Sequence, residues 1–156
     1  MSAKVRQVLA FITALMLAAG VGTLIHFLSG RSDLYKAAAE RIDAEFGEYI
    51  DVTYIGKPPE TPEALVVVVV QKKLFESSTD PLFVAFDDLL SKEIRALIND
   101  EVEVDLYILN EDLDGGYVVG FDAQGLKNGK TLNETVMAST SISGTPEPEF
   151  LVWMDK

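Results

Sequence analysis

The feature that most constrains this chain is an uninterrupted apolar run near the N-terminus. Residues 8–28 contain no charged side chain, and their polar members are only Thr13, Thr23 and His26. A helix rises 1.5 Å per residue, so this run would be about 30 Å long, the thickness of the hydrocarbon core of a bilayer. The run predicts a transmembrane helix over residues 8–28, preceded by a short segment, residues 1–7.

Small side chains recur at every fourth position inside this run, at Ala10, Ala14, Ala18 and Gly22. Positions four apart lie on one face of a helix. In a bilayer, close approach of two helices depends on such small faces, because lipid tails are as apolar as leucine. The stripe indicates a packing face for another transmembrane helix, although alanine is also common in membrane helices for no such reason.

The positive charges that flank the run set its expected orientation. Lys4 and Arg6 precede the run, and a markedly acidic region follows it, so the positive-inside rule places the N-terminus in the cytoplasm. The rest of the chain is then extracytoplasmic, which in a bacterium means the periplasm. A cleaved signal peptide is the alternative, with residues 17–20 as a cleavage site, but its apolar core is usually shorter than this one.

The charge of the chain is strongly divided. Only Lys4, Arg6 and Arg31 are charged before Ser32, whereas the remainder holds ten basic and all twenty-five acidic residues, a net charge of −15. Such a domain repels phosphate backbones and anionic headgroups, which argues against nucleic-acid binding and lipid-surface docking. We expect its partner to be an integral membrane protein or envelope complex with a basic surface.

Residues 29–32 form a juxtamembrane break, and residues 33–156 are expected to form one acidic α+β domain. Two amphipathic helices are predicted, over residues 33–48 and from the N-cap Asp80 to about Ile98. The first has an apolar stripe at Leu34, Ala38, Ile42 and Phe46. The stripe of the second is Leu82, Phe86, Leu90, Ile94 and Leu97.

The predicted sheet is mainly antiparallel, with about five strands. These are residues 49–55, 65–70, 102–109, 116–121 and 150–154, with 131–143 open between an edge strand and a short helix. The run Val66–Val70 predicts a central strand that is covered on both faces. Alternation in the third strand directs Val102 and Val104 to the core and Tyr107 to the other face. In the last strand Trp153 is the expected anchor in the core or at an interface.

Groups that carry catalysis are scarce. The chain has no cysteine, its only histidine is His26, and no serine lies in a Gly-x-Ser-x-Gly motif. Asp87 and Asp88 are adjacent on a helix and diverge by about 100°, so we expect them on a solvated face rather than as a catalytic pair. The sequence predicts neither an enzyme nor a cofactor.

One loop resembles the opening of a calcium-binding loop. Asn110, Asp112 and Asp114 place oxygen ligands at positions 1, 3 and 5, and Gly115 follows. Position 12 is Phe121 where a bidentate glutamate is needed, and strands flank the loop. Because Asn, Asp and Gly also favour hairpin turns for backbone reasons, the same residues suit an ordinary turn.

Two functions therefore follow from the sequence. The first is a non-catalytic, single-pass accessory or interaction subunit of a membrane protein complex, held by a signal anchor. The alternative is a membrane-tethered module that senses a ligand or cation through the Asn110, Asp112 and Asp114 loop.

Overall fold

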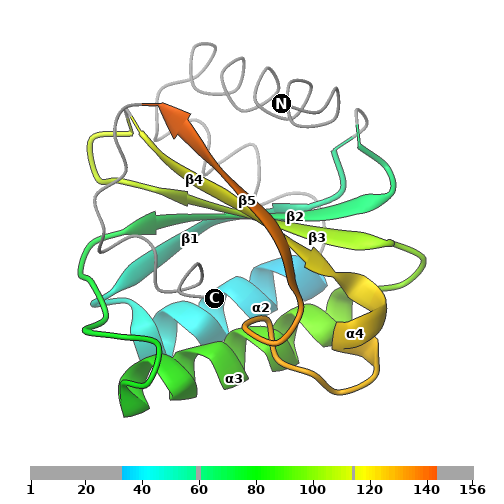
Figure 1. Ribbon diagram of the computed structural model, residues 1–156, viewed down its shortest axis with the longest axis horizontal. Coiled ribbons are helices and arrows are strands. Elements are labelled where there is room, and N and C mark those ends of the chain that lie inside the picture. The colour runs from blue at the N-terminus through cyan, green and yellow to red at the C-terminus, as the bar shows by residue number, and fades with distance from the viewer. Residues whose placement is uncertain (1–32, 59–60, 114, 144–156) are drawn as a thin grey trace.

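The computed structural model describes residues 33–58, 61–113 and 115–143, which form an α+β fold around a five-stranded mixed sheet (Figure 1). The helices are α2 (Asp33–Phe46), α3 (Pro81–Leu97) and α4 (Ala123–Lys127). The strands are β1 (Ile50–Gly56), β2 (Ala64–Gln71), β3 (Glu103–Leu109), β4 (Gly116–Asp122) and β5 (Val136–Ser143).

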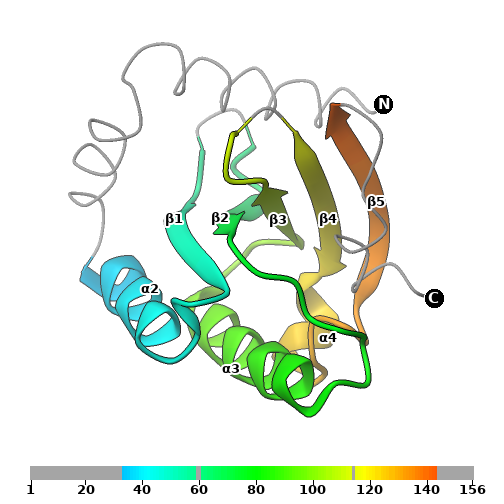
Figure 2. The ribbon, with the colours of Figure 1, turned by 90° about the vertical axis from the view of Figure 1, so that its left-hand side faces the viewer.

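The strands lie side by side in chain order, from β1 at one edge to β5 at the other. β2 and β3 are parallel and α3 is the crossover between them, whereas the other neighbouring pairs are antiparallel. Helices α2 and α3 pack on the same face of this sheet (Figures 1 and 2). The expected α+β class is confirmed, and the sheet is mixed.

Helix α3 forms where the sequence predicts it. The Asp80 carboxylate accepts a hydrogen bond from the Leu82 backbone N–H at 2.9 Å, and Pro81 occupies the first turn, where its missing N–H costs nothing. The predicted apolar stripe is wrong at its start, because Leu82 is 36% exposed and Phe83 is buried instead. The helix therefore turns Phe83, Phe86 and Leu90 toward the sheet.

The helix-covered face of the sheet holds the main core. Its buried members come from α2, α3, α4, strands β1 to β4 and the loops beside them, and include Ala38, Ile42, Phe46, Leu65, Val67, Phe86, Leu90, Ile94, Leu106 and Phe121. Four phenylalanines meet beneath the start of α3, with ring centroids of Phe86 at 5.1 Å from Phe75 and 5.3 Å from Phe46. Phe83 lies 5.4 Å from Phe75 in the same cluster.

The opposite side of the sheet, here called the second face, is also apolar. The strand register aligns five of its side chains in one row across all five strands: Tyr54, Val68, Tyr107, Val118 and Thr140. Buried residues on this face form a separate cluster, Tyr54, Val66, Val68, Tyr107, Leu109 and Val118, against which Leu113 and Ile142 pack. The described helices contribute no side chain to that cluster.

The valine run behaves as predicted in one respect and differs in another. β2 is buried on both faces, because Val67 and Val69 join the main core and Val66 and Val68 join the second-face cluster. It lies between β1 and β3, however, and the middle strand of the sheet is β3.

The ends of the sheet differ in part from the sequence prediction. Val102 is 61% exposed and precedes β3 instead of entering the core. The open segment 131–143 contains an edge strand, β5, which is the fifth strand of the sheet. The strand predicted over residues 150–154, with Trp153, lies outside the described residues.

Within the part of the chain that the structure describes, no helix has the length and apolar character needed to cross a bilayer. The predicted transmembrane helix, residues 8–28, lies outside that part, and so do Ala10, Ala14, Ala18 and Gly22.

Candidate functional site

The loop that resembles a calcium site is the turn between β3 and β4. The Asn110 N–H donates to the Gly115 carbonyl at 3.0 Å, and the Leu113 N–H donates to the Asn110 carbonyl at 3.1 Å. Leu113 has φ +59°, a left-handed conformation unusual for leucine, and its side chain packs on the second-face cluster. The turn is thus closed by its own backbone.

The structure describes only two of the three ligands that the sequence predicts for this loop. Asn110 and Asp112 are described, with Asp112 exposed, whereas Asp114 lies outside the described residues. Among the described residues no three His, Cys, Asp or Glu side chains are grouped so as to hold a metal ion.

We expect calcium to leave the stability of this protein unchanged, because backbone hydrogen bonds already close the turn. Asp112→Ala should change the free energy of unfolding by less than about 0.5 kcal/mol, as for other exposed positions. Thermal unfolding of the full-length chain with and without millimolar calcium checks this. A ligand at 100 times its Kd would add about 2.7 kcal/mol, so a clear rise in Tm that Asp112→Ala abolishes would support the cation-sensing alternative instead.

Asp87 is not on a solvated face, which corrects the expectation from the sequence. Its side chain is buried between α3 and the segment before β5, whereas its neighbour Asp88 is exposed. The Asn133 N–H donates to Asp87 Oδ1 at 3.2 Å, and the Ser91 hydroxyl donates to the same oxygen at 3.4 Å. Ser91 Oγ in turn accepts the Leu132 N–H at 2.8 Å. Asp87 and Ser91 therefore hold this segment against the helix.

The segment that Asp87 holds also has a capping box. The Thr131 N–H donates to Glu134 Oε2 at 2.8 Å, and the Glu134 N–H donates to Thr131 Oγ1 at 3.4 Å. Such reciprocal bonds satisfy backbone donors at the start of a helical turn. The polar groups around Asp87 thus have a structural role, and they fix where β5 begins.

Burial raises the pKa of Asp87 above its ordinary value, although hydrogen bonds from Thr131, Asn133 and Ser91 act in the opposite direction. A raised pKa means that the folded chain binds this proton more readily than the unfolded chain. The resulting stability is present below the unfolded pKa of about 4 and is lost as the pH rises through the folded value.

Asp87→Asn should therefore gain stability relative to the wild type as the pH rises from 4 to 7. The amide is always neutral, and its oxygen can still accept from Asn133 and Ser91. Urea unfolding of both proteins at several pH values measures the difference, with Asp112→Asn as the exposed control that should show no such trend. A difference that shrinks with rising pH would mean that the fold prefers the Asp87 carboxylate.

Basic side chains of the domain are largely engaged by nearby acids. Lys57 Nζ lies 2.9 Å from Asp100 and 3.0 Å from Glu101, and Arg41 Nη2 lies 2.6 Å from the buried Glu93 carboxylate. Burial would raise the pKa of Glu101, but Lys57 and the Asn99 N–H outweigh it and hold that pKa below its ordinary value. These ion pairs tie loops and helices together and leave the surplus of negative charge uncompensated.

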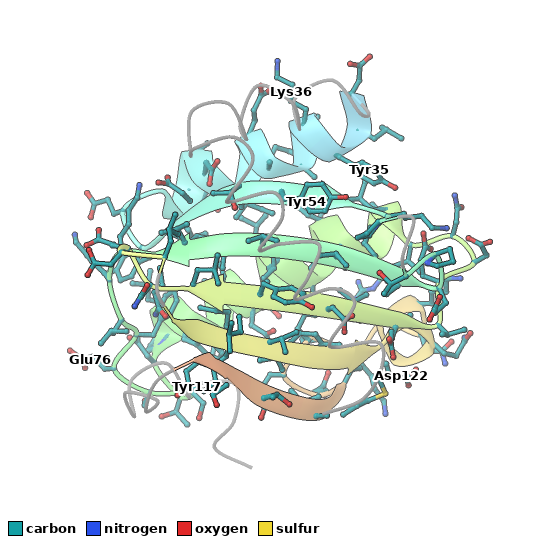
Figure 3. All side chains as sticks on the ribbon, turned by 90° about the horizontal axis from the view of Figure 1, so that it is seen from above. Tyr35, Lys36, Tyr54, Glu76, Tyr117 and Asp122 are labelled. Carbon is teal, nitrogen blue, oxygen red and sulfur yellow. The ribbon has the colours of Figure 1, made fainter. Side chains whose placement is uncertain are left out.

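The second face combines apolar and acidic side chains (Figure 3). Glu103 and Asp105 occupy the same side of β3 as Tyr107, at the end of the strand away from Leu109. Burial raises the pKa of Tyr107, and the charges of Asp105 and Glu103 add to the effect. The face is thus apolar toward the β3–β4 turn and acidic toward α4.

A group of exposed carboxylates at one end of the sheet is a second surface feature that the sequence motifs did not reveal. Because β2 and β3 are parallel, the loop after β2 and the turn after β3 meet at one end of the sheet. The exposed carboxylates of Glu76, Glu111 and Asp112, here called the acidic end, lie on these two loops. The loop after β2 also carries Lys72 and Lys73, which form ion pairs with Asp51 and Glu48 of neighbouring segments. The parallel pairing that brings the two loops together was not visible in the sequence.

Comparison of this chain with protein-family models, with curated proteins and with solved structures finds no match.

Proposed function

We propose that this chain is a non-catalytic, single-pass membrane protein that serves as an accessory or interaction subunit of a membrane protein complex. Residues 8–28 anchor it, the N-terminus is cytoplasmic, and the acidic α+β domain lies outside the cytoplasm and docks on a basic surface of the partner. The observation that carries the proposal is the division of the chain into a cationic apolar segment and a region of net charge −15 from Ser32 onward, whose described residues form the α+β fold.

The acidic end is the part of the domain that we assign to docking. Helix α2 runs from Asp33 to Phe46, and a short turn after it leads into β1 at the end of the sheet where β2 finishes. Its 14 residues span about 20 Å. Asp33, which follows the predicted anchor, is thus separated by that length from the acidic end. Figure 3 shows Tyr35 and Glu76 on opposite sides of the domain.

This separation implies an orientation of the domain relative to the membrane. With the anchor in the bilayer, the acidic end faces away from the membrane surface and is accessible to the extramembrane part of a neighbouring protein. Carboxylates in such positions attract a basic surface over roughly a Debye length, about 8 Å at physiological ionic strength. The small-residue stripe Ala10, Ala14, Ala18 and Gly22 adds a lateral contact inside the bilayer.

The arrangement of carboxylates also supports a non-catalytic role. The two most deeply placed acids of α3, Asp87 and Glu93, are bonded to Asn133 and Arg41, respectively. These partners lie on other segments, so each acid stabilises the packing of the fold.

Charge reversal at the acidic end tests this function. Glu76→Lys, Glu111→Lys and Asp112→Lys together should remove the chain from its complex, because a basic partner is then repelled. Native gel electrophoresis of mildly solubilised membranes measures the size of the species that contains the chain. The wild-type chain should migrate with a larger complex, and the triple variant should migrate alone.

A matched control reverses charges elsewhere on the same domain. Asp33→Lys and Asp100→Lys change exposed positions at the start of α2 and just before β3, at the end of the domain opposite the acidic end. This variant should stay in the complex. Loss of the complex in both variants would mean that the net charge of the domain, and not the acidic end, determines binding. A wild-type chain that migrates alone would contradict the proposed function.

A further inference from the structure

The second face is a buried apolar surface that no described helix covers. Val66 is 0% exposed and Tyr107 is 1% exposed, values typical of a core, yet α2, α3 and α4 all contribute to the main core on the other side. Polar residues would be expected on a sheet face that met water. The second face is therefore built to receive an apolar segment.

Strand β5 ends beside this surface, at Ser143. Ser143 pairs with Gly116, which pairs with Leu109 of β3, so β5 ends where the second face is apolar. The opposite end of the face carries Glu103 and Asp105. Ile142, the residue before the last one of β5, already packs on the second-face cluster.

The sequence after Ser143 consists of a short linker followed by an apolar stretch. Residues 144–149 are Gly-Thr-Pro-Glu-Pro-Glu, a sequence that favours extended backbone, and residues 150–154 are Phe-Leu-Val-Trp-Met. We propose that residues 150–154 of this chain lie on the second face, with Trp153 against the row formed by Val68, Tyr107 and Val118.

The linker is long enough for this contact. Six extended residues reach about 20 Å at 3.3 Å each. The five strands span four spacings of about 4.8 Å, which is about 19 Å. Residues 150–154 can therefore reach any strand of the face from the end of β5.

Two other occupants fit less well. A second copy would bring Glu103 and Asp105 of one chain against the acidic side chains of the same face in the other, and like charges repel. Residues 8–28 are apolar on all sides, so a helix laid on the sheet would leave half of its apolar surface in water. The choice of the C-terminal residues rests on the proposed membrane anchor, which places residues 8–28 in the bilayer.

Cross-linking tests the proposal cleanly, because the chain contains no cysteine. Thr140→Cys with Leu151→Cys places one thiol on the second face and one in the C-terminal segment of the full-length chain. The matched control is Ser141→Cys with Leu151→Cys, since Ser141 is the next residue of β5 and points to the opposite side of the sheet. A short bismaleimide should join positions 140 and 151 within one chain several times faster than positions 141 and 151.

The remaining outcomes separate this proposal from the function above. Equal rates at positions 140 and 141 would overturn the proposal and leave the membrane anchor untouched. A faster link between Thr140→Cys and Ala14→Cys would overturn both, since residues 8–28 would then cover the sheet. Rapid formation of a covalent dimer by Thr140→Cys alone would overturn the proposal in favour of a second copy.

Trp153 gives an independent measurement, because it is the only tryptophan of the chain. Its fluorescence in the native wild-type protein should be several times less sensitive to quenching by acrylamide than in the urea-unfolded protein. Equal sensitivity in the two states would show that Trp153 has no buried contact and would overturn the proposal.

Discussion

A chain in which Leu15 and Ala18 are both replaced by arginine is expected to be lost from the membrane fraction. Each arginine near the centre of a membrane-spanning helix costs about 2.5–3.5 kcal/mol on the insertion scale. Two of them cost about 5–7 kcal/mol, enough to abolish insertion of a span with no compensating acid in residues 8–28. Alkaline washing of membranes, followed by detection of the chain in pellet and supernatant, measures the effect.

The control for this prediction exchanges the same positions for apolar residues of other sizes, Leu15→Val and Ala18→Leu. That variant should stay in the pellet like the wild type, because the hydrophobicity of the span is retained. Recovery of the wild-type chain in the supernatant would contradict the anchor, and recovery of the double-arginine variant in the pellet would show that another part of the chain holds the membrane.

Phe86→Ala is expected to cost about 3–5 kcal/mol of folding stability, the usual range for deleting a buried phenylalanine ring. Phe86 is 3% exposed and lies at the centre of the aromatic cluster, in contact with Phe46 of α2 and Phe75 of the loop after β2. Its loss leaves a cavity where α2, α3 and the sheet meet. Chemical unfolding of the full-length protein at fixed detergent concentration gives the change.

Val84 provides the comparison for Phe86, because it belongs to the same helix and is 46% exposed. Val84→Ala should change the free energy of unfolding by no more than about 0.5 kcal/mol. If Phe86→Ala were equally mild, the cluster would not be the centre of the core, and α3 would pack mainly through Leu90 and Ile94.

Local patterns predicted the elements of this fold well. The N-cap Asp80 with Pro81 located the start of α3, and the valine run identified an interior strand buried on both faces. Both signals depend on neighbouring residues alone. The dipeptide Asn128-Gly129 is common in hairpin turns, but here it follows the short helix α4, and Gly129 has φ +94°.

Patterns that depend on distant partners were less informative. Asp87 lies off the predicted apolar stripe of its helix, as a solvated residue would, and only the return of residues 131–133 against α3 makes it a buried acceptor. Tyr107 was expected to face away from the core, which it does, but the sheet has a second apolar face there. The pairing of Tyr107 with Val68 in the parallel register could not be foreseen from the sequence of its own strand.

The same limit applies to the candidate sites. The resemblance of the Asn110, Asp112 and Asp114 loop to a calcium site came from spacing, whereas the turn geometry shows how Asn110 and Gly115 serve the backbone. The acidic end depends on the parallel pairing of β2 and β3, which no single segment reveals.

The measurement that tests the central claim most directly is native mass spectrometry of this chain extracted gently from its own membranes. We predict the mass of the full-length chain together with a stoichiometric membrane partner, and release of that partner at high salt, which screens an acidic docking surface. A lone monomer of full-length mass would contradict the role as an accessory subunit. A chain that lacks its N-terminal residues would contradict the anchor.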